Sequence, residues 1–335
     1  MLHIDLQGTH YEIGLQWGAE LAAEGHRILE AVPFPITRER LDFAQACLPH
    51  CQQWFPGALE ELRGLAEGQS CPLAPLAAVL FSMYAMPPEP RCSCFALRGP
   101  EGVLFGRNSD FLTPLEKYNT NARLRFTDQG LSFNGNTTAF VEMEDGVNGA
   151  GLAVGLTSVP PAGPPRPGLN AGLVLRLLLE RCSRVEEALD LLARLPLSSS
   201  HTLTLADPSG DLALAECCPE GTAVFRPEGG RAAVWAVNAF HLPGMAPFHR
   251  PVEDDWQAEE RYATLAGALT PGDVQRDAPA GMALLAGKRG FLCQYDRNLG
   301  RDTVWSVLWE GAAGRLWRCE GNPGRMPFME DRRPL

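Results

Sequence analysis

Pairs of short apolar runs joined by glycine-containing turns fill the chain after Pro90, and they constrain its fold more than any other feature. Each pair is typical of an antiparallel hairpin with a loop of four or five residues. The predicted pairs are 94–97 with 103–108, 203–206 with 212–217, 223–226 with 232–238, and 303–309 with 315–319. They predict extensive antiparallel sheet in this part of the chain.

The residues before Pro90 have a helical pattern instead. Apolar residues recur at helical spacing over 12–32, 38–55, 58–66 and 76–86, and no strand is predicted there. Later helices are predicted over 171–182, 185–195, 255–269 and 278–286. Because helices and hairpins occur without strand–helix–strand alternation, we expect an α+β fold in which sheet packs on sheet and helices cover the outside.

Charge and apolar content exclude several classes of partner. The 29 Lys and Arg residues and 40 Asp and Glu residues give a net charge of −11, which disfavours nucleic acid and anionic membranes as partners. The longest uncharged stretch, 71–88, is interrupted by prolines and falls short of the roughly 20 residues needed to span a bilayer. The first residues lack a signal-peptide pattern, so we expect a cytoplasmic protein whose ten cysteines are reduced thiols.

The first hairpin places three reactive side-chain types at one corner. If its loop spans 98–102, paired residue numbers sum to 200, so Cys92 faces Asn108 and lies beside Arg107 and Asp110. Directly opposed residues are about 5 Å apart. A hairpin that ends in an Arg–Asp ion pair beside incidental cysteines would show the same pattern, so the local sequence leaves a structural and a catalytic interpretation open.

The same residues resemble a known family. Arg91-Cys-Ser-Cys-Phe-Ala96 and Gly106-Arg-Asn-Ser-Asp110 are similar to the motif of N-terminal nucleophile (Ntn) hydrolases of the acyl-coenzyme A:6-aminopenicillanic acid acyltransferase type, and of the related choloylglycine and penicillin V amidases. Further similarities follow in the family's order: a pro-segment motif at 12–14, an N-x-x-G-L hairpin at 146–152, an Asn-bearing strand at 235–240, a helix motif at 260–262, and a closing hairpin at 303–318.

The resemblance implies a fold and a processing step. The implied fold is a four-layer αββα sandwich of two antiparallel sheets flanked by helices. Residues 1–91 would be a helical pro-segment and 92–335 the catalytic domain. Cys92 would attack the carbonyl group before it, and water would then release 1–91 as a separate but still docked chain.

This arrangement has a physical rationale. A thiol with a pKa near 8.5 is mostly protonated at pH 7, so it needs a base within hydrogen-bond reach. A cysteine at the start of its own chain carries an α-amino group with a pKa of about 7.7–8.0. That amine can take the thiol proton and later protonate a leaving amine, so no histidine is required.

The resemblance also implies roles for five residues. Cys92 would be nucleophile and base together, Asp110 would hold its amino group, and Arg107 would hydrogen-bond near the sulfur and favour the thiolate. Asn238 would donate its amide N–H to the oxyanion. Arg261 would support the site from a helix, by pairing with a buried carboxylate or with the strand of Asn238.

Two departures from the family motif affect this site. Leu156-Thr-Ser158 stands where the amidases have an Asn, so a hydroxyl replaces one expected oxyanion donor. Arg91 stands where several relatives have Gly, which leaves cleavage before Cys92 open. Cys94 is the weaker candidate for the nucleophile and is interpreted as a small core thiol.

Other kinds of site have less support. A Cys–His thiol enzyme could use His201 or His241, but neither lies in a recognisable signature. A zinc site lacks a second cysteine pair at ligand spacing, and the glycines of 149–155 do not form a dinucleotide loop. We therefore expect no metal and no cofactor.

The predicted activity is thiol-dependent amide hydrolysis or acyl transfer on a small molecule. The acyl group would pass from an amide or thioester to Cys92 and then to water or an amine. The alternative is an uncleaved, non-catalytic member of the same fold that binds a small acyl or peptide ligand in the same cleft.

Overall fold

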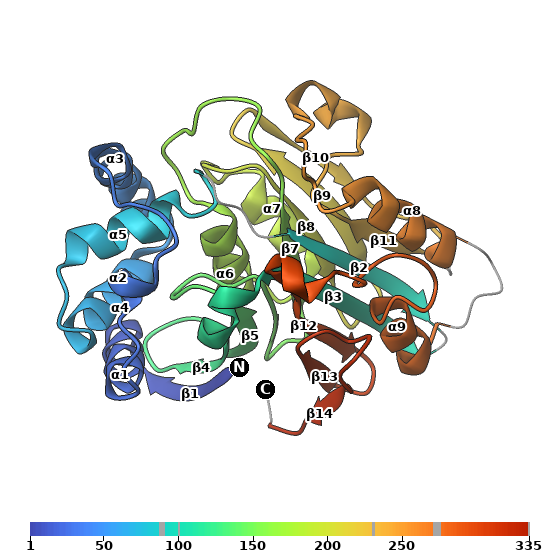
Figure 1. Ribbon diagram of the computed structural model, residues 1–335, viewed down its shortest axis with the longest axis horizontal. Helices are drawn as coiled ribbons and strands as arrows, with labels where there is room; N and C mark the ends of the chain where they lie inside the picture. Colours follow the sequence, from blue (N-terminus) through green and yellow to red (C-terminus); the bar gives the residue numbers. More distant parts are fainter. Residues whose placement is uncertain (87–90, 100, 230–231, 271–275, 334–335) are drawn as a thin grey trace.

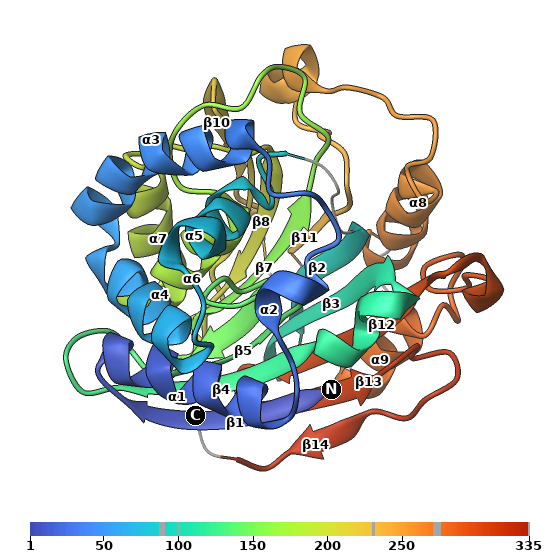
Figure 2. The same ribbon diagram turned by 60° about the vertical axis from the view of Figure 1, so that its left-hand side comes forward.

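The computed structural model describes residues 1–86, 91–99, 101–229, 232–270 and 276–333, which form two facing sheets with helices on both outer sides (Figure 1, Figure 2). One sheet has eight strands in the order β1-β4-β5-β6-β7-β8-β9-β10, and the other has six in the order β11-β2-β3-β12-β13-β14. This arrangement confirms the predicted αββα sandwich. Every neighbouring pair of these strands is antiparallel except β1 and β4, which are parallel, so the expectation of purely antiparallel sheets is wrong at this edge.

The strand bounds are as follows. The larger sheet contains β1 (Leu2–Gly8), β4 (Thr120–Phe126), β5 (Phe133–Thr137), β6 (Asp145–Asn148), β7 (Ala153–Ser158), β8 (His201–Ala206), β9 (Leu212–Cys218) and β10 (Gly221–Phe225). The smaller sheet contains β11 (Ala233–Ala236), β2 (Arg91–Gly99), β3 (Gly102–Leu112), β12 (Arg301–Glu310), β13 (Arg315–Glu320) and β14 (Met329–Asp331).

Helices cover the outer face of each sheet (Figure 1). On the larger sheet lie α1 (His10–Ala23), α2 (Ile28–Ala31), α3 (Arg38–Trp54), α4 (Pro56–Gly68), α5 (Leu73–Ser82), α6 (Ala171–Arg181) and α7 (Val185–Leu192). On the smaller sheet lie α8 (Ala258–Leu269) and α9 (Ala278–Leu285), and short 3-10 turns occupy Thr113–Tyr118, Pro243–Phe248 and Arg297–Leu299. No helix among the described residues is both long and apolar enough to cross a bilayer.

The apolar core has three main parts, as the layers require. One lies between α1–α7 and the larger sheet, a second between the two sheets, and a third between the smaller sheet and α8 and α9. Burial of apolar side chains in all three parts drives folding, because each sheet presents apolar side chains on both of its faces. The predicted helices 171–182, 185–195, 255–269 and 278–286 correspond to α6–α9 and are confirmed.

The first element corrects a prediction. Residues before Pro90 were expected to contain no strand, yet β1 pairs in parallel with β4. Its exposure alternates, with Ile4 and Leu6 buried and Asp5 and Gln7 exposed, which is the period of a half-buried strand. The proposed pro-segment therefore supplies an edge strand of the larger sheet as well as five helices.

The predicted register of the first hairpin is wrong by one residue. Gly99 pairs with Gly102, so paired numbers sum to 201 and the loop has two residues. Cys92 therefore faces Ser109, and Arg107 faces Cys94. A one-residue shift moves every side chain to the other face. It places Arg107 on the same side of the sheet as Cys94 and Cys92, because alternate residues of a strand share a face.

The third predicted hairpin does not form. Strand β10 pairs with β9 in the larger sheet, whereas β11 pairs with β2 in the smaller one. The chain thus changes sheets between two runs that the sequence places next to each other. The other two hairpins, β8 with β9 and β12 with β13, are confirmed.

Candidate active site

Cys92 lies at the start of β2, fully buried, and each of its three polar groups has a partner. Its Sγ accepts a hydrogen bond from Nη2 of Arg107 at 2.7 Å. Its backbone N–H donates to Oδ1 of Asn238 at 2.8 Å, and its carbonyl accepts from Nη1 of Arg261 at 2.6 Å. Three of the other four residues singled out from the sequence therefore meet around Cys92 of β2. They come from β3, the loop after β11, and α8.

Asp110, the fifth residue, lies behind Arg261. Its Oδ2 is 3.8 Å from Nη1 of Arg261 and accepts from the Tyr295 hydroxyl at 3.1 Å, while its Oδ1 accepts from the Thr303 hydroxyl at 2.6 Å. In the intact chain the backbone N–H of Cys92 donates to Asn238, and the Asp110 carboxylate lies near Arg261. The expected contact between Asp110 and the amino group of Cys92 concerns the cleaved chain and stays a prediction.

Arg261 makes both of the contacts that were expected as alternatives. Besides lying near Asp110, it donates from Nη2 to Oδ1 of Asn238 at 3.0 Å. Asn238 donates from Nδ2 to the Ser158 carbonyl at 2.8 Å. The guanidinium, fully buried on α8, therefore links the backbone of Cys92 to the side chain of Asn238.

Two carboxylates that the sequence analysis missed hold Arg107. Its Nη2 is 3.0 Å from Oε2 of Glu144, its Nη1 is 2.9 Å from Oδ2 of Asp145, and its Nε donates to the Leu156 carbonyl at 2.9 Å. All three charged side chains are essentially inaccessible to solvent. The run Glu142-Met-Glu-Asp145, directly before the N-x-x-G-L hairpin, was a signal for these residues, since buried acidic residues need a partner.

Burial of the thiol opposes its ionisation. It raises the pKa of Cys92 to about 12, and the charge of Arg107, which acts in the opposite direction, does not overcome it. The negative charge of Glu144 adds to the effect of burial. Burial also raises the pKa of Asp110 to about 6, against the effect of Arg261. The thiol of the intact chain is therefore protonated near neutral pH.

The remaining candidates from the sequence make no hydrogen bond to Cys92 among those of the described residues. The Thr157 hydroxyl, expected in place of an oxyanion donor, donates to the Val237 carbonyl at 2.5 Å. Cys94 packs in the core between the sheets, in agreement with its interpretation as a core thiol. Buried His201 contacts Ser199, and His241 stacks on Tyr262. Within the described residues neither histidine hydrogen-bonds to Cys92, and no group of three or more His, Cys, Asp or Glu could hold a metal ion.

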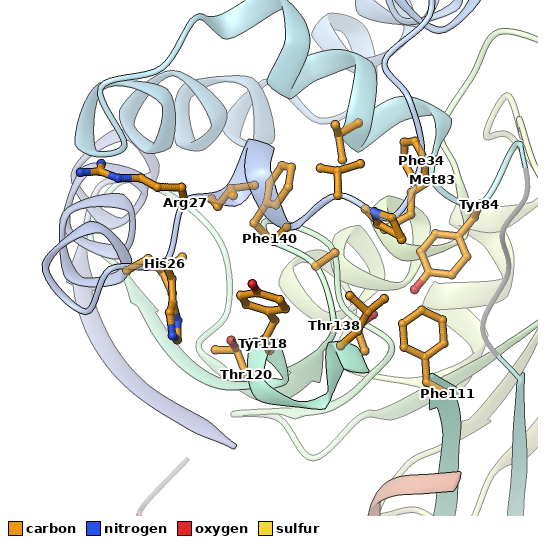
Figure 3. Close-up of a pocket in the computed structure, with 18 residues that line it drawn as sticks. His26, Arg27, Phe34, Met83, Tyr84, Phe111, Tyr118, Thr120, Thr138 and Phe140 are labelled. Atoms are coloured by element: carbon orange, nitrogen blue, oxygen red, sulfur yellow. Dashed lines mark hydrogen bonds between the residues drawn. The ribbon is translucent and has the colours of Figure 1, made fainter. Parts of the chain in front are cut away.

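An apolar pocket is lined by residues from before and after Cys92 in the sequence (Figure 3). It encloses about 860 Å³ of empty space, including its mouth, between residues of the first 91 positions and the 3-10 turn and strands that follow β3. Tyr84, Phe111 and Thr138 gather at one end (Figure 3). Thr138 donates from N and Oγ1 to Oε1 of Glu144, at 3.1 and 2.5 Å, so the pocket wall connects through Glu144 to Arg107.

Comparisons with solved structures give distant likenesses. An N-acylethanolamine-hydrolyzing acid amidase ortholog from Caenorhabditis elegans is 16% identical, with a TM-score of 0.49 over 66% of this chain and 93% of that one. Penicillin V acylase from Agrobacterium tumefaciens is 16% identical, with a TM-score of 0.41 over 68% of this chain and 82% of that one.

Sequence comparison is more informative. The 40 kDa form of acyl-coenzyme A:6-aminopenicillanic-acid-acyltransferase from Emericella nidulans is 29% identical over 201 residues, which are 56% of this chain and 55% of that protein. The chain thus spans about half the length of this relative. The family described as acyl-coenzyme A:6-aminopenicillanic acid acyl-transferase matches residues 97–325, a region that starts just after Cys92 and includes Arg107, Asp110, Asn238 and Arg261. With more than half of its length matched, the chain belongs to the acyl-coenzyme A:6-aminopenicillanic acid acyl-transferase family, as its motifs predicted.

Proposed function

We propose that this protein is a cysteine Ntn hydrolase or acyltransferase that forms an acyl intermediate on Cys92 after autocatalytic cleavage of the Arg91–Cys92 bond. The observation that carries the proposal is the engagement of Cys92 at all three polar groups, by Arg107, Asn238 and Arg261. The backbone groups of any buried residue need partners, but a structural thiol of the core would not need a guanidinium at its sulfur. Such convergence of buried polar groups on one thiol is typical of a reaction centre.

The intact chain is a latent form in this proposal. Its thiol has a pKa of about 12, and the nitrogen of Cys92 is an amide, which cannot accept a proton. Cleavage converts this amide into an amine, whose ordinary pKa is about 7.7–8.0. The base therefore comes into existence only when the bond before Cys92 is broken.

Cleavage is an acyl shift followed by hydrolysis. Sγ of Cys92 attacks the carbonyl carbon of Arg91, the C–N bond breaks, and the thiol proton passes to the departing nitrogen, which leaves a thioester and a free amine. Water then cleaves the thioester into the Arg91 carboxylate and the Cys92 thiol. Asn238 supports this step because its Oδ1 already accepts a hydrogen bond from the backbone nitrogen of Cys92, which is the leaving group.

Turnover repeats these steps on a substrate. The amine of Cys92 takes the thiol proton as Sγ attacks the acyl carbon, and then gives that proton to the leaving amine. Water or an acceptor amine removes the acyl group from sulfur. Asn238 and Arg261 keep the Cys92 backbone in place, while Arg107 positions Sγ.

Residues 1–91 stay bound after cleavage. Strand β1 is part of the larger sheet, and α1 and α4 share the core with α6 and α7. Two buried ion pairs also cross this boundary: Glu61 with Arg176 at 2.6 Å, and His10 with Glu180 at 2.9 Å. Release would expose the core and leave Arg176 and Glu180 without these partners.

The apolar pocket favours a substrate with an apolar acyl group, which the pocket would bind. Its lining is mostly hydrophobic, and its inner end reaches the Glu144 side of the Cys92 cluster. A carbonyl held at Sγ would let its acyl chain extend along this pocket.

All ten cysteines are unpaired, which suits the reducing cytoplasm.

Intact mass and a substrate panel test the proposal. The wild type is expected to yield fragments of 91 and 244 residues (335 − 91 = 244) that copurify, and Cys92→Ala a single chain of 335. The panel consists of N-acyl amino acids, acyl-homoserine lactones, penicillin V and acyl-coenzyme A thioesters, with Cys94→Ala as the matched control. Hydrolysis that survives in Cys92→Ala would refute the mechanism. An unbroken wild-type chain that binds acyl ligands without turnover would favour the non-catalytic alternative.

A further inference from the structure

Tyr84 combines two features: its hydroxyl is buried without a partner, and the residue lines the apolar pocket. The residue is 2% exposed, and its Oη has no hydrogen bond within the described part of the chain. A buried hydroxyl without a partner costs free energy, so native proteins rarely keep one unless a ligand or water uses it. Tyr84 also lines the apolar pocket, at the end where Phe111 and Thr138 lie (Figure 3).

This end of the pocket faces the reaction centre. Thr138 binds Glu144, and Oε2 of Glu144 in turn accepts hydrogen bonds from Arg107 and from Ser109, the residue opposite Cys92. Phe111 directly follows Asp110 on β3. The charges of Glu144 and Arg107 both act on the Tyr84 hydroxyl.

The backbone holds Tyr84 in this place. It follows α5, whose residues Leu76–Phe81 are buried, and the Met86 N–H bonds back to the Ser82 carbonyl around it. The position of Tyr84 therefore depends on the packed helix α5, and cleavage of the bond before Cys92 should not change it. Because burial raises its pKa well above 10, the hydroxyl keeps its proton and can only be used as a neutral donor or acceptor.

Asn238, expected to donate to the oxyanion, donates from Nδ2 to the Ser158 carbonyl, and the Thr157 hydroxyl donates to the Val237 carbonyl, so the proposed reaction would gain from a further donor to the acyl carbonyl. We propose that the Tyr84 hydroxyl donates a hydrogen bond to the carbonyl oxygen of the substrate's acyl group as Cys92 attacks it. Because Tyr84 lines the pocket, an acyl chain that occupies the pocket contacts this residue. The inference rests on the proposed function and assigns to the first 91 residues a direct part in turnover.

Tyr84→Phe tests this role, since it removes one oxygen and leaves the ring in place. The probes are the octanoyl and phenylacetyl amides of 7-amino-4-methylcoumarin, used with the protein as purified. We expect kcat to fall about 100-fold with KM changed less than about threefold, because the donor acts mainly in the transition state. Cleavage before Cys92 and the rate of Cys92 alkylation by iodoacetamide should equal those of the wild type, and the melting temperature should not fall.

The control is Tyr11→Phe, which removes a hydroxyl that bonds Glu67 on the surface of the same segment. It should leave kcat and KM unchanged. A kcat for Tyr84→Phe within threefold of the wild type would overturn the inference. Slower alkylation of Cys92 in Tyr84→Phe would also overturn it, because the hydroxyl would then act on the thiol. Loss of cleavage in this variant would overturn it as well, because the hydroxyl would then act on the Arg91–Cys92 bond. Failure of the proposed function is seen separately, as turnover by Cys92→Ala.

Discussion

A single nitrogen of Arg107, Nη2, lies 2.7 Å from Sγ of Cys92 and 3.0 Å from Oε2 of Glu144. The thiol and the carboxylate therefore share one guanidinium. Asp145 takes the other terminal nitrogen of Arg107. A buried Arg next to a cysteine is usually expected to favour the thiolate, but here burial of the thiol and the charge of Glu144 together outweigh the effect of Arg107 on the pKa of Cys92. This relationship leads to the first prediction.

Glu144→Gln should make Cys92 more reactive. The substitution removes a negative charge that raises the pKa of the thiol. It keeps one oxygen, which in the place of Oε2 still accepts from Ser109 and Arg107, while the amide nitrogen replaces Oε1 at Thr138. Alkylation of Cys92 by iodoacetamide at pH 8.5 should become about tenfold faster, the equivalent of one pKa unit. Mass spectrometry of the labelled peptide measures the rate, with surface Glu187→Gln as the control. An unchanged or slower rate would show that Glu144 does not restrain the thiol.

Arg176→Leu should strongly destabilise the protein. The guanidinium pairs with Glu61 of α4 and Glu180 of α6, and all three residues are buried. Removing it leaves buried Glu61 without its partner and Glu180 with His10 alone, at a cost of about 3–5 kcal/mol. Urea denaturation measures the loss. Arg63→Leu, which breaks an exposed pair with Glu60, should cost less than about 1 kcal/mol, and equal losses in the two variants would contradict the prediction.

His10 should make stability depend on pH. Burial lowers its pKa, but the hydrogen bonds and charges of Glu180 and Asp128 outweigh burial, so the pKa lies above 6.5 in the folded protein. A raised pKa means that the histidine contributes stability below pH 6.5 and loses it as the pH rises through the folded value. His10→Gln should therefore destabilise more at pH 5.5 than at pH 8.5. Urea titrations at the two pH values, each against the wild type, test this, and a larger loss at pH 8.5 would reverse the sign.

Gly64→Ala should force apart the crossing of α1 and α4. A Cβ on Gly64 would lie 2.0 Å from the Tyr11 carbonyl oxygen, a backbone atom that cannot move alone. We expect a loss of about 1–3 kcal/mol, as for other overpacked cores. Gly267→Ala in α8 is the matched control, because a Cβ there meets nothing within 4 Å and alanine favours the helix by up to about 1 kcal/mol. The two melting temperatures should move in opposite directions, and a shared direction would argue against close packing as the cause.

Local elements were predictable because local residues determine them. The helices α6–α9 and the hairpins β2–β3, β8–β9 and β12–β13 follow from periodicity and turns that lie within each segment. The one-residue error in the first register arose because the pairing of Gly99 with Gly102 makes a two-residue loop, which the spacing of apolar residues does not distinguish from a longer one. That error placed Arg107 on the wrong face.

Contacts between distant segments were not predictable in this way. Strand β1 pairs with β4, about 118 positions along the chain, and β10 and β11 enter different sheets although few residues separate them. No local pattern records such choices, because they depend on which sheet edge is free when the layers pack. The pairing of Arg107 with Glu144 and Asp145 has the same origin.

The order of residues along the chain determined the hairpins, most helices, the family motifs and the identity of the five residues of the candidate site. The tertiary structure alone decided their chemistry, since it buried Cys92, brought Glu144 and Asp145 to Arg107, and placed Tyr84 in the pocket without a partner. The physical reason is that a side chain's pKa and hydrogen bonds depend on the dielectric and the charges around it. Those surroundings come from segments that only folding brings together.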